Sequence, residues 1–225
     1  QKSNNDDFEE KQKDKEEFKI SKVQYYSSTN AISNTTNYQN PEWDLKVYQY
    51  TDIAIYLDRI NKASSKNYIT KLSLSNFSLE SNKEDLKIYY LNPKNFGNSS
   101  LNNDEDITNN LEYNVINSSN SDNEQTYNIP IFFQDCSNPI TLRIVDVLSN
   151  NYKVENTLEY NGKLIRGLGL GIKDLNKKIS FDITVETKTG SPRIKSLELE
   201  IPYENNEKSI LDGDFEEKIK INEQF

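Results

Sequence analysis

Alternation of apolar and polar residues is the feature of this sequence that most restricts its fold. It is clearest in residues 179–203, ISFDITVETKTGSPRIKSLELEIPY. The apolar positions are Ile179, Phe181, Ile183 and Val185 before a turn near Thr189-Gly190, and Leu197, Leu199 and Ile201 after it. A period of two puts alternate side chains on opposite faces of a strand. The segment therefore predicts an antiparallel hairpin with one buried and one wet face.

The same alternation recurs along the chain between turn signals. The strand candidates begin at Phe18 and continue as Trp43–Arg59, Ile69–Leu79, Leu86–Leu91, Leu111–Val115, Ile129–Phe133, Ile140–Leu148, Thr157–Tyr160, Lys163–Ile165 and Glu217–Ile221, besides the hairpin. Asn161-Gly162 indicates a type I′ turn joining the two candidates beside it. The only helical candidate inside the fold is Ile172–Lys178.

Many short strands with no helices to cover a sheet favour a sandwich. We therefore predict an all-β fold, an antiparallel β-sandwich (Ig-like or jelly-roll-like) with about ten strands and one short helix. It forms a single domain over residues 18–225. Residues 1–17 contain one large apolar side chain, Phe8, and are predicted to be a charged, disordered stalk or linker that contributes nothing to folding.

Missing residue types exclude several kinds of chemistry. The chain has no His, which removes Ser–His and Cys–His triads, His-ligated zinc and the HExxH metalloprotease motif. Its single Cys excludes internal disulfides, thiolate zinc sites and iron–sulfur clusters. Cys136, which follows two phenylalanines, is expected to be a small, buried and unreactive hydrophobe, because no base accompanies it.

Charge argues against two classes of partner. The net charge is -9, and the lysines are interleaved with carboxylates, so a basic patch for nucleic acid is not expected. Attachment to an anionic membrane surface is disfavoured for the same reason. The sequence has no apolar run long enough to span a bilayer.

Amino-acid usage suggests an origin and a compartment. The chain has 23 lysines against 4 arginines, and Asn is roughly one residue in seven, which indicates an A/T-rich genome. A low-GC Gram-positive bacterium is the first choice and a protist the second. The chain starts at Gln1 and lacks Met, so we expect a processed product with a signal peptide or membrane anchor upstream of Gln1.

Two motifs resemble ligand sites. Asp104 and Asp106 in NDEDI are candidate calcium ligands, because calcium prefers oxygen donors in a loop, and DGD at 212–214 is a second acidic cluster. Neither has EF-hand spacing, and a solvated loop is the favoured interpretation. Gly167, Gly169 and Gly171 are spaced G-x-G-x-G and not as a dinucleotide fingerprint, so they predict a connector that crosses between sheets.

Aromatic residues suggest a sugar platform as an alternative to simple packing. Trp43 and Tyr25, Tyr26, Tyr48, Tyr50, Tyr56, Tyr89 and Tyr90 all fall in or near predicted strands. Aromatic residues are enriched in strands in any case, so packing within the sheets is the favoured interpretation. Carboxylate pairs for glycoside hydrolysis meet in space, and the sequence does not identify them.

Three stretches carry a resemblance. NPEWDLKVYQYTDIAIYLDR, IPIFFQDCSNPITLRIVD and NGKLIRGLGLGIKDLNKKISFDITV resemble uncharacterised exported or membrane-anchored β-sandwich proteins of low-GC Gram-positive, Clostridium-like bacteria. The resemblance covers roughly Phe18 to Tyr203. It implies a surface location and no particular activity.

We therefore expect a non-enzymatic extracytoplasmic domain on the cell surface that acts through protein or cell-envelope glycan contacts. The alternative is a carbohydrate-binding module or a carboxylate-based glycoside hydrolase. The segment Asn92–Asn110 is expected to be the most mobile internal loop and the main contact surface, because loops of this length are usually functional or disordered. An Asn-rich insertion without function is the competing interpretation.

Overall fold

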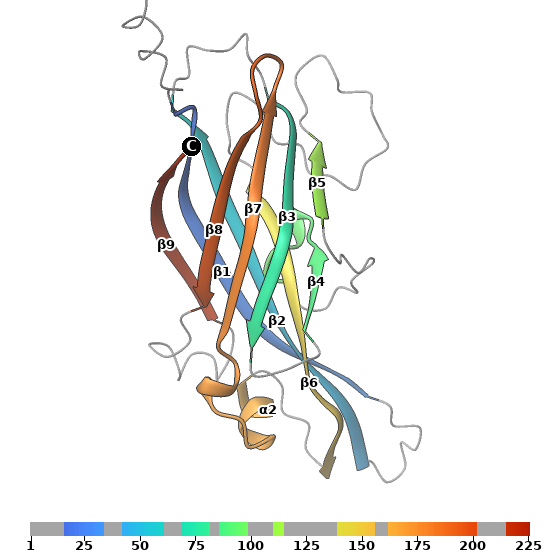
Figure 1. Cartoon of the computed structure of the whole chain (residues 1–225). Coiled ribbons are helices and arrows are strands. Elements are labelled where there is room, and N and C mark those ends of the chain that lie inside the picture. Colours follow the sequence, from blue (N-terminus) through green and yellow to red (C-terminus); the bar gives the residue numbers. More distant parts are fainter. Residues whose placement is uncertain are drawn as a thin grey trace, which may run out of the picture.

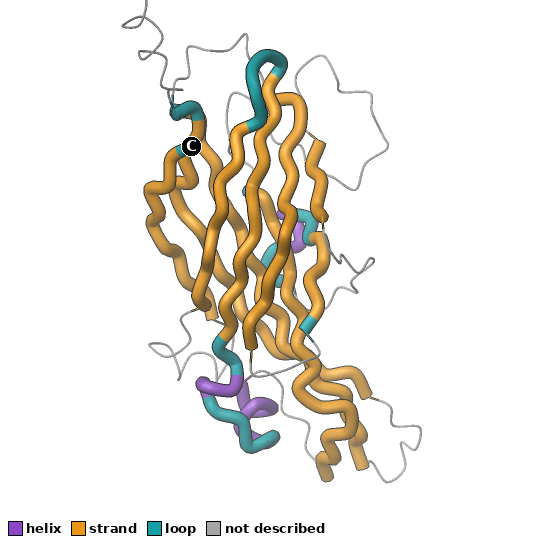
Figure 2. The backbone as a smooth tube through the Cα atoms, viewed as in Figure 1, coloured by secondary structure: helices purple, strands orange, loops and turns teal. Residues whose placement is uncertain are grey.

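Two antiparallel sheets make up the fold. The computed structural model describes residues 16–33, 42–60, 69–81, 86–98, 110–114, 139–155, 162–201 and 215–225. In this part of the chain most residues are in strands, and the helices are short (Figures 1 and 2). The predicted all-β, antiparallel sandwich is confirmed.

The first sheet has five strands in the order β4-β6-β2-β1-β9. They are β1 (Phe18–Ser33), β2 (Glu42–Arg59), β4 (Lys87–Tyr90), β6 (Ile140–Glu155) and β9 (Phe215–Gln224). The second sheet has the order β5-β3-β7-β8. Its strands are β3 (Ile69–Ser81), β5 (Asn110–Asn114), β7 (Lys177–Thr187) and β8 (Arg193–Ile201). The predicted β7–β8 hairpin is confirmed, and Gly190 at its turn has a φ of 96°.

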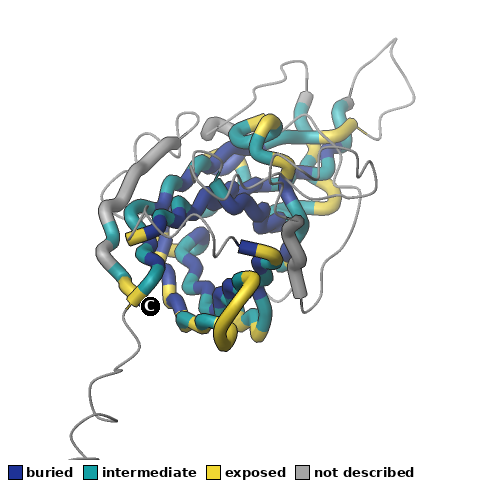
Figure 3. The backbone as a smooth tube through the Cα atoms, turned by 90° about the horizontal axis from the view of Figure 1, so that it is seen from above, coloured by how far each residue is buried: buried dark blue, intermediate teal, exposed yellow. Residues whose placement is uncertain are grey.

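The main core lies between the two sheets, where the alternating apolar residues meet (Figure 3). Ile53 and Ile55 of β2 and Leu72 and Leu74 of β3 are all fully buried in this one cluster. Each such side chain contributes roughly 1.5–3 kcal/mol when it leaves water. The face of each sheet toward the other is called its inner face below.

The first sheet departs from the expected pattern of one wet face. Residues 49–55 of β2 are buried at every position, so both faces of the sheet are covered at its centre. The inner face packs on the second sheet, and residues 91–98 lie over the outer face, as shown below. Alternation alone does not reveal a sheet that is covered on both sides.

Beyond the sandwich, three strands of the first sheet continue into an arm (Figure 1). We define the arm as residues 30–33 of β1, 42–48 of β2 and 147–155 of β6, which remain paired with one another. Leu45 and Val47 of the arm pack against Leu164 in a second, smaller cluster. The arm is therefore covered by the connector that contains Leu164 and not by the second sheet.

That connector crosses from β6 in the first sheet to β7 in the second, and it carries Gly167, Gly169 and Gly171 as predicted. It contains the helix α2 (Gly162–Gly167) and the 3-10 turn η2 (Ile172–Asp174). Two local predictions are wrong here. Lys163–Ile165 is helical and not a strand, and only the start of Ile172–Lys178 is helical.

Packing explains both corrections. Leu164 joins the arm cluster while its neighbour Ile165 joins the main core, so tertiary contacts override the turn signal that precedes them. Lys177 pairs with Ile201, and Lys178 pairs with Glu200. The last residues of the predicted helix therefore belong to the β7–β8 ladder.

Several predictions fall outside the described residues: the strands Ile129–Phe133 and Thr157–Tyr160, Cys136, and residues 1–15 of the stalk. Glu17, which we assigned to the stalk, is bonded to the fold. Its N–H donates to the carbonyl of Phe225 at 2.9 Å, and its carbonyl accepts from the N–H of Ile60 at 2.8 Å.

Candidate functional site: the outer face of the five-stranded sheet

Tyr26, Asp52, Arg143 and Tyr89 form a row across four strands of the first sheet. Asp52 is opposite Tyr26 of β1 and Arg143 of β6, and Arg143 is opposite Tyr89 of β4. Residues that are directly opposite in an antiparallel pair point to the same face. Because the next residue of β2, Ile53, is in the main core, this row lies on the outer face.

A buried ion pair is at the centre of the row. The Arg143 Nε atom lies 2.6 Å from Asp52 Oδ1, and Nη2 lies 2.9 Å from Oδ2, with both side chains 1% exposed. This two-point geometry matches the planar guanidinium to the carboxylate. The guanidinium also lies 4.8 Å from the centre of the Tyr50 ring.

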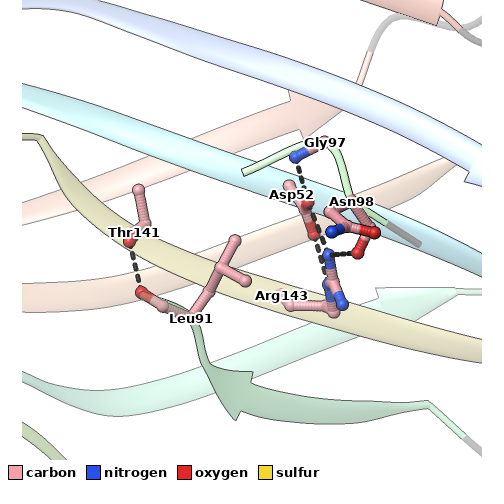
Figure 4. A network of polar contacts seen from close by, with 6 residues as sticks. All are labelled: Asp52, Leu91, Gly97, Asn98, Thr141 and Arg143. Atoms are coloured by element: carbon pink, nitrogen blue, oxygen red, sulfur yellow. Dashed lines mark hydrogen bonds and ion pairs between the residues drawn. The ribbon is translucent and has the colours of Figure 1, made fainter. Parts of the chain in front are cut away.

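The ion pair holds a backbone segment onto the sheet (Figure 4). The N–H of Gly97 donates to Asp52 Oδ2 at 2.8 Å, and Arg143 Nη2 donates to the carbonyl of Asn98 at 2.8 Å. Thr141 Oγ1 donates to the carbonyl of Leu91. We call Asp52, Arg143 and Thr141 the clamp, because together they fix residues 91–98 at both ends.

Burial shifts the acidity of this site. It raises the pKa of the Asp52 carboxyl, and the bonds from Arg143 and from the Gly97 N–H oppose that shift. Burial also raises the pKa of Tyr50, against the attraction of Arg143. The charges and donors of the clamp are used to hold and orient the segment.

The segment itself is shaped to fit. The 3-10 turn η1 (Pro93–Asn95) is capped by the Asn92 side chain, whose Oδ1 accepts from the N–H of Lys94 at 3.0 Å. Gly97 has a φ of 79°, and a Cβ there would lie 3.3 Å from the Tyr26 ring. Glycine at this position thus allows both the left-handed turn and the close approach to the tyrosine. Phe96 meets the same ring edge to face, with centroids 6.1 Å apart.

Tyrosines extend this face toward the arm. The rings of Tyr48 and Tyr50 are stacked, with centroids 6.1 Å apart and an interplanar angle of 15°. Tyr50 is buried, whereas Tyr48 and Tyr89 are half-buried. Lys46 Nζ lies 5.2 Å from the centre of the Tyr48 ring. Partly accessible tyrosines are typical of binding surfaces.

The predicted aromatic platform is thus divided among three places. Tyr25 is in the main core, and Tyr90 packs against it. Trp43 packs partly buried against the arm cluster. The outer face receives the rest: Tyr26, Tyr48, Tyr50, Tyr56 and Tyr89. On the outer face Tyr26 packs against Phe96 and Tyr48 against Tyr50, so packing within the sheets still accounts for these residues, and a sugar platform stays a prediction.

The predicted calcium ligands, Asp104 and Asp106, lie outside the described residues, as do residues 212–214. Within the part of the chain that the structure describes, no group of three or more Cys, Asp or Glu side chains is arranged to hold a metal ion. Calcium binding stays a prediction.

The predicted contact loop Asn92–Asn110 is described at residues 92–98 and at Asn110. Residues 92–98 are held by the clamp, so the start of the loop is a docked segment. Two of their backbone groups are bonded to buried charged side chains, and the mobility expected of Asn92–Asn110 stays a prediction.

Sequence reasoning missed Asp52 and Arg143. A signal was present: each is a charged residue inside a run of apolar and aromatic residues, YTDIAIYL and ITLRIVDV. A charge at such a position is buried only when it is paired. The sequence did not indicate which residues were partners, because they are 91 positions apart.

No protein-family model matches this chain, and no curated protein or solved structure is significantly similar to it. The resemblance to exported proteins of Clostridium-like bacteria therefore stays a prediction. Of the helices in the described ranges, none has the length and apolar character to span a membrane.

Proposed function

We propose that this chain is a non-enzymatic extracytoplasmic domain of the cell surface that acts through protein or envelope contacts. Its contact surface is the clamped face, which we define as residues 92–98 with Tyr48 and Tyr89. The charged, apolar-poor composition of residues 1–16 supports display on a stalk. A rigid sheet that carries a shaped segment is a common arrangement for binding.

The clamp is the observation that carries this proposal. A buried ion pair adds little stability over a well-packed apolar pair, because both charges must leave water. Here the pair bonds to the backbone of Gly97 and Asn98, so it fixes the conformation of an exposed segment. Positioning that segment is the role that best accounts for burying two charges at the surface of the sheet.

The double variant Asp52→Leu/Arg143→Met tests this role. It removes both charges together, so the free energy of unfolding should stay within about 1–2 kcal/mol of the wild type. Binding to isolated cell envelopes of a low-GC Gram-positive bacterium, measured by co-sedimentation, should fall at least tenfold. Glu200→Gln, on the exposed side of β8, is the control and should bind normally. Equal binding by all three proteins, or no binding by the wild type, would contradict the proposal.

A carbohydrate-binding module remains the second candidate, and the stacked Tyr48 and Tyr50 rings favour it. Only Tyr48 of the two offers an accessible surface to a sugar. Titration with soluble cell-wall oligosaccharides, followed by calorimetry, should then show binding that Tyr48→Ala abolishes. Glycoside hydrolysis would need a pair of carboxyl groups. Among the described residues the buried carboxylates are Asp52 and Asp146, and each is paired with a cation and not with the other.

A further inference from the structure

Three polar side chains meet inside the sandwich, between the sheets. Gln49 of β2 is directly opposite Asp146 of β6, and both point to the inner face. Lys177, the first residue of β7, reaches them from the second sheet. The three residues are 1%, 1% and 4% exposed, respectively. We call them the inner cluster.

The inner cluster brings an amine, a carboxamide and a carboxylate together. Lys177 Nζ lies 3.4 Å from Gln49 Oε1 and 3.7 Å from Asp146 Oδ2. It also donates to the carbonyl of Leu175 at 2.9 Å. Gln49 Nε2 donates to Ser27 Oγ at 2.9 Å, which turns the carboxamide oxygen toward the lysine.

This geometry differs from that of a stabilising ion pair. A buried pair needs short, well-matched contacts to offset the loss of hydration, and the amine and carboxylate are 3.7 Å apart. Burial lowers the pKa of Lys177 to about 8, against the attraction of Asp146. Near neutral pH the lysine is therefore a neutral amine in a fraction of the molecules. A desolvated lysine amine is a nucleophile, and the Gln49 carboxamide, whose oxygen lies 3.4 Å from Nζ, is an electrophile beside it.

We propose that Lys177 and Gln49 join in an intramolecular amide bond, with Asp146 as the group that moves the proton. The fixed arrangement replaces an encounter between two molecules, and well-oriented groups reach effective concentrations of about 10⁵–10⁸ M. Asp146 is opposite the carboxamide in the strand register, and its Oδ2 lies 3.7 Å from the amine, so it must close to hydrogen-bond distance as the reaction begins.

The reaction balances without any other reactant. Asp146 accepts one proton from the Lys177 ammonium, and the free amine forms a bond from Nζ to Cδ of Gln49. The bond from Cδ to Nε2 breaks, and a second proton passes from Nζ to Nε2. Ammonia leaves and takes up the proton held by Asp146. One ammonium group and one carboxamide become one secondary amide and one ammonium ion, and nothing is oxidised or reduced.

The bond would connect the two sheets through their shared interior. Gln49 belongs to the central strand β2 of the first sheet, and Lys177 opens a central strand of the second. The closed loop contains the strands between them in sequence, so an unfolded chain would lose much of its freedom.

The intact mass of the purified protein tests the proposal directly. We expect a mass lower than that of the sequence by one ammonia molecule in most of the protein, under reducing and denaturing conditions. Proteolysis should yield one joined peptide that contains Gln49 and Lys177. An unchanged mass would overturn the proposal. So would the loss of one water molecule, because that would join the lysine to Asp146.

Matched variants separate the bond from the fold. Lys177→Arg and Asp146→Asn should each restore the full sequence mass, corrected for the substitution, while circular dichroism still shows strands. Lys178→Arg is the control, because this neighbour lies at the surface beside Glu198, 3.0 Å away, and it should keep the ammonia loss. If Lys177→Arg keeps that loss as well, Lys177 is not the nucleophile. If Asp146→Asn keeps it, the assigned proton transfer is wrong.

Discussion

The sandwich and the arm are parts of the same first sheet, and they differ in what covers them. In the sandwich, the inner face of β2 meets an entire second sheet, with Ile53 and Ile55 in the main core. In the arm, the same strand places Leu45 and Val47 against Leu164 of α2, a helix of 6 residues. A continuous set of backbone pairs therefore runs from a thickly covered region into a thinly covered one.

The difference shows that strand pairing and burial are separate contributions to this fold. Hydrogen bonds of the β1–β2–β6 ladder continue to the end of the arm, but a ladder alone adds little net free energy. Regions with few buried apolar contacts open first. We therefore expect the arm to open locally while the sandwich remains folded.

Removing one partner of the clamp should have the largest effect, because it lies in the sandwich. Asp52→Ala leaves the Arg143 guanidinium buried without its carboxylate, which costs about 3–5 kcal/mol of unfolding free energy. Urea denaturation measures this loss, and the double variant Asp52→Leu/Arg143→Met should recover most of it. A loss below about 1 kcal/mol would place the pair among exposed, weak ion pairs.

Leucine truncation in the arm should act locally. Leu45→Ala removes a buried side chain of the arm cluster, and we expect local opening to become easier by about 2–3 kcal/mol, within the range for such cavities. Hydrogen exchange should accelerate at residues 42–48 and 147–155 and stay unchanged in β7. Ile55→Ala is the matched change in the sandwich and should accelerate exchange in both sheets. If Leu45→Ala also accelerates exchange in β7, the arm and the sandwich open as one unit.

A close contact in the arm offers a smaller change with a rescue. A Cβ on Gly167 would lie 2.1 Å from the Tyr152 hydroxyl oxygen, so Gly167→Ala forces the tyrosine to move. Because Gly167 is exposed and the obstacle is the far end of one side chain, this should cost about 1 kcal/mol, the low end for overpacking. Local opening of the arm, measured by hydrogen exchange, should become easier by that amount. Tyr152→Leu in the same chain should restore protection, and no rescue would mean that the ring is not the obstacle.

The smallest effect concerns a surface network of the second sheet. Asp182 accepts from Ser196 Oγ at 2.6 Å and from Asn76 Nδ2 at 2.7 Å, and these bonds lower its pKa below the usual 3.8. The folded carboxyl thus binds its proton less readily than the unfolded one. The contribution is present above pH 3.8 and is lost as the pH falls through the folded pKa. Because the group is exposed, we expect less than about 1 kcal/mol.

Comparing Asp182→Asn with the wild type in urea at several pH values measures this contribution. The variant should lose less stability than the wild type as the pH falls below 4. Identical pH profiles would show that the network contributes nothing.

The strands could be predicted from the sequence because alternation is a local property. Phe18 begins β1 as predicted, and the hairpin turn near Gly190 is where it was expected. The α2 helix was missed because its two apolar residues, Leu164 and Ile165, enter different clusters, which only the assembled fold determines. Packing contacts of this kind override a local turn signal such as Asn161-Gly162.

The clamp and the inner cluster could not be predicted in the same way. Each joins residues that are far apart in sequence, 91 positions for Asp52 and Arg143 and 128 for Gln49 and Lys177. A charge inside an apolar run indicates that a partner exists, but the pairing of strands decides which residue it is. Sequence reasoning was therefore sufficient for the frame of the fold and not for its polar contacts.

The bonds between the two ends of the described fold have a mechanical consequence. The N–H groups of Glu17 and Phe18 both donate to the carbonyl of Phe225, and β9 pairs antiparallel with β1 from there. A force that pulls residue 17 away from residue 225 would therefore break the β1–β9 hydrogen bonds one after another, as in a zipper, at low load. A force applied at residue 17 alone and resisted at the clamped face would load different bonds, because it would be carried across the first sheet through β1, β2 and β6.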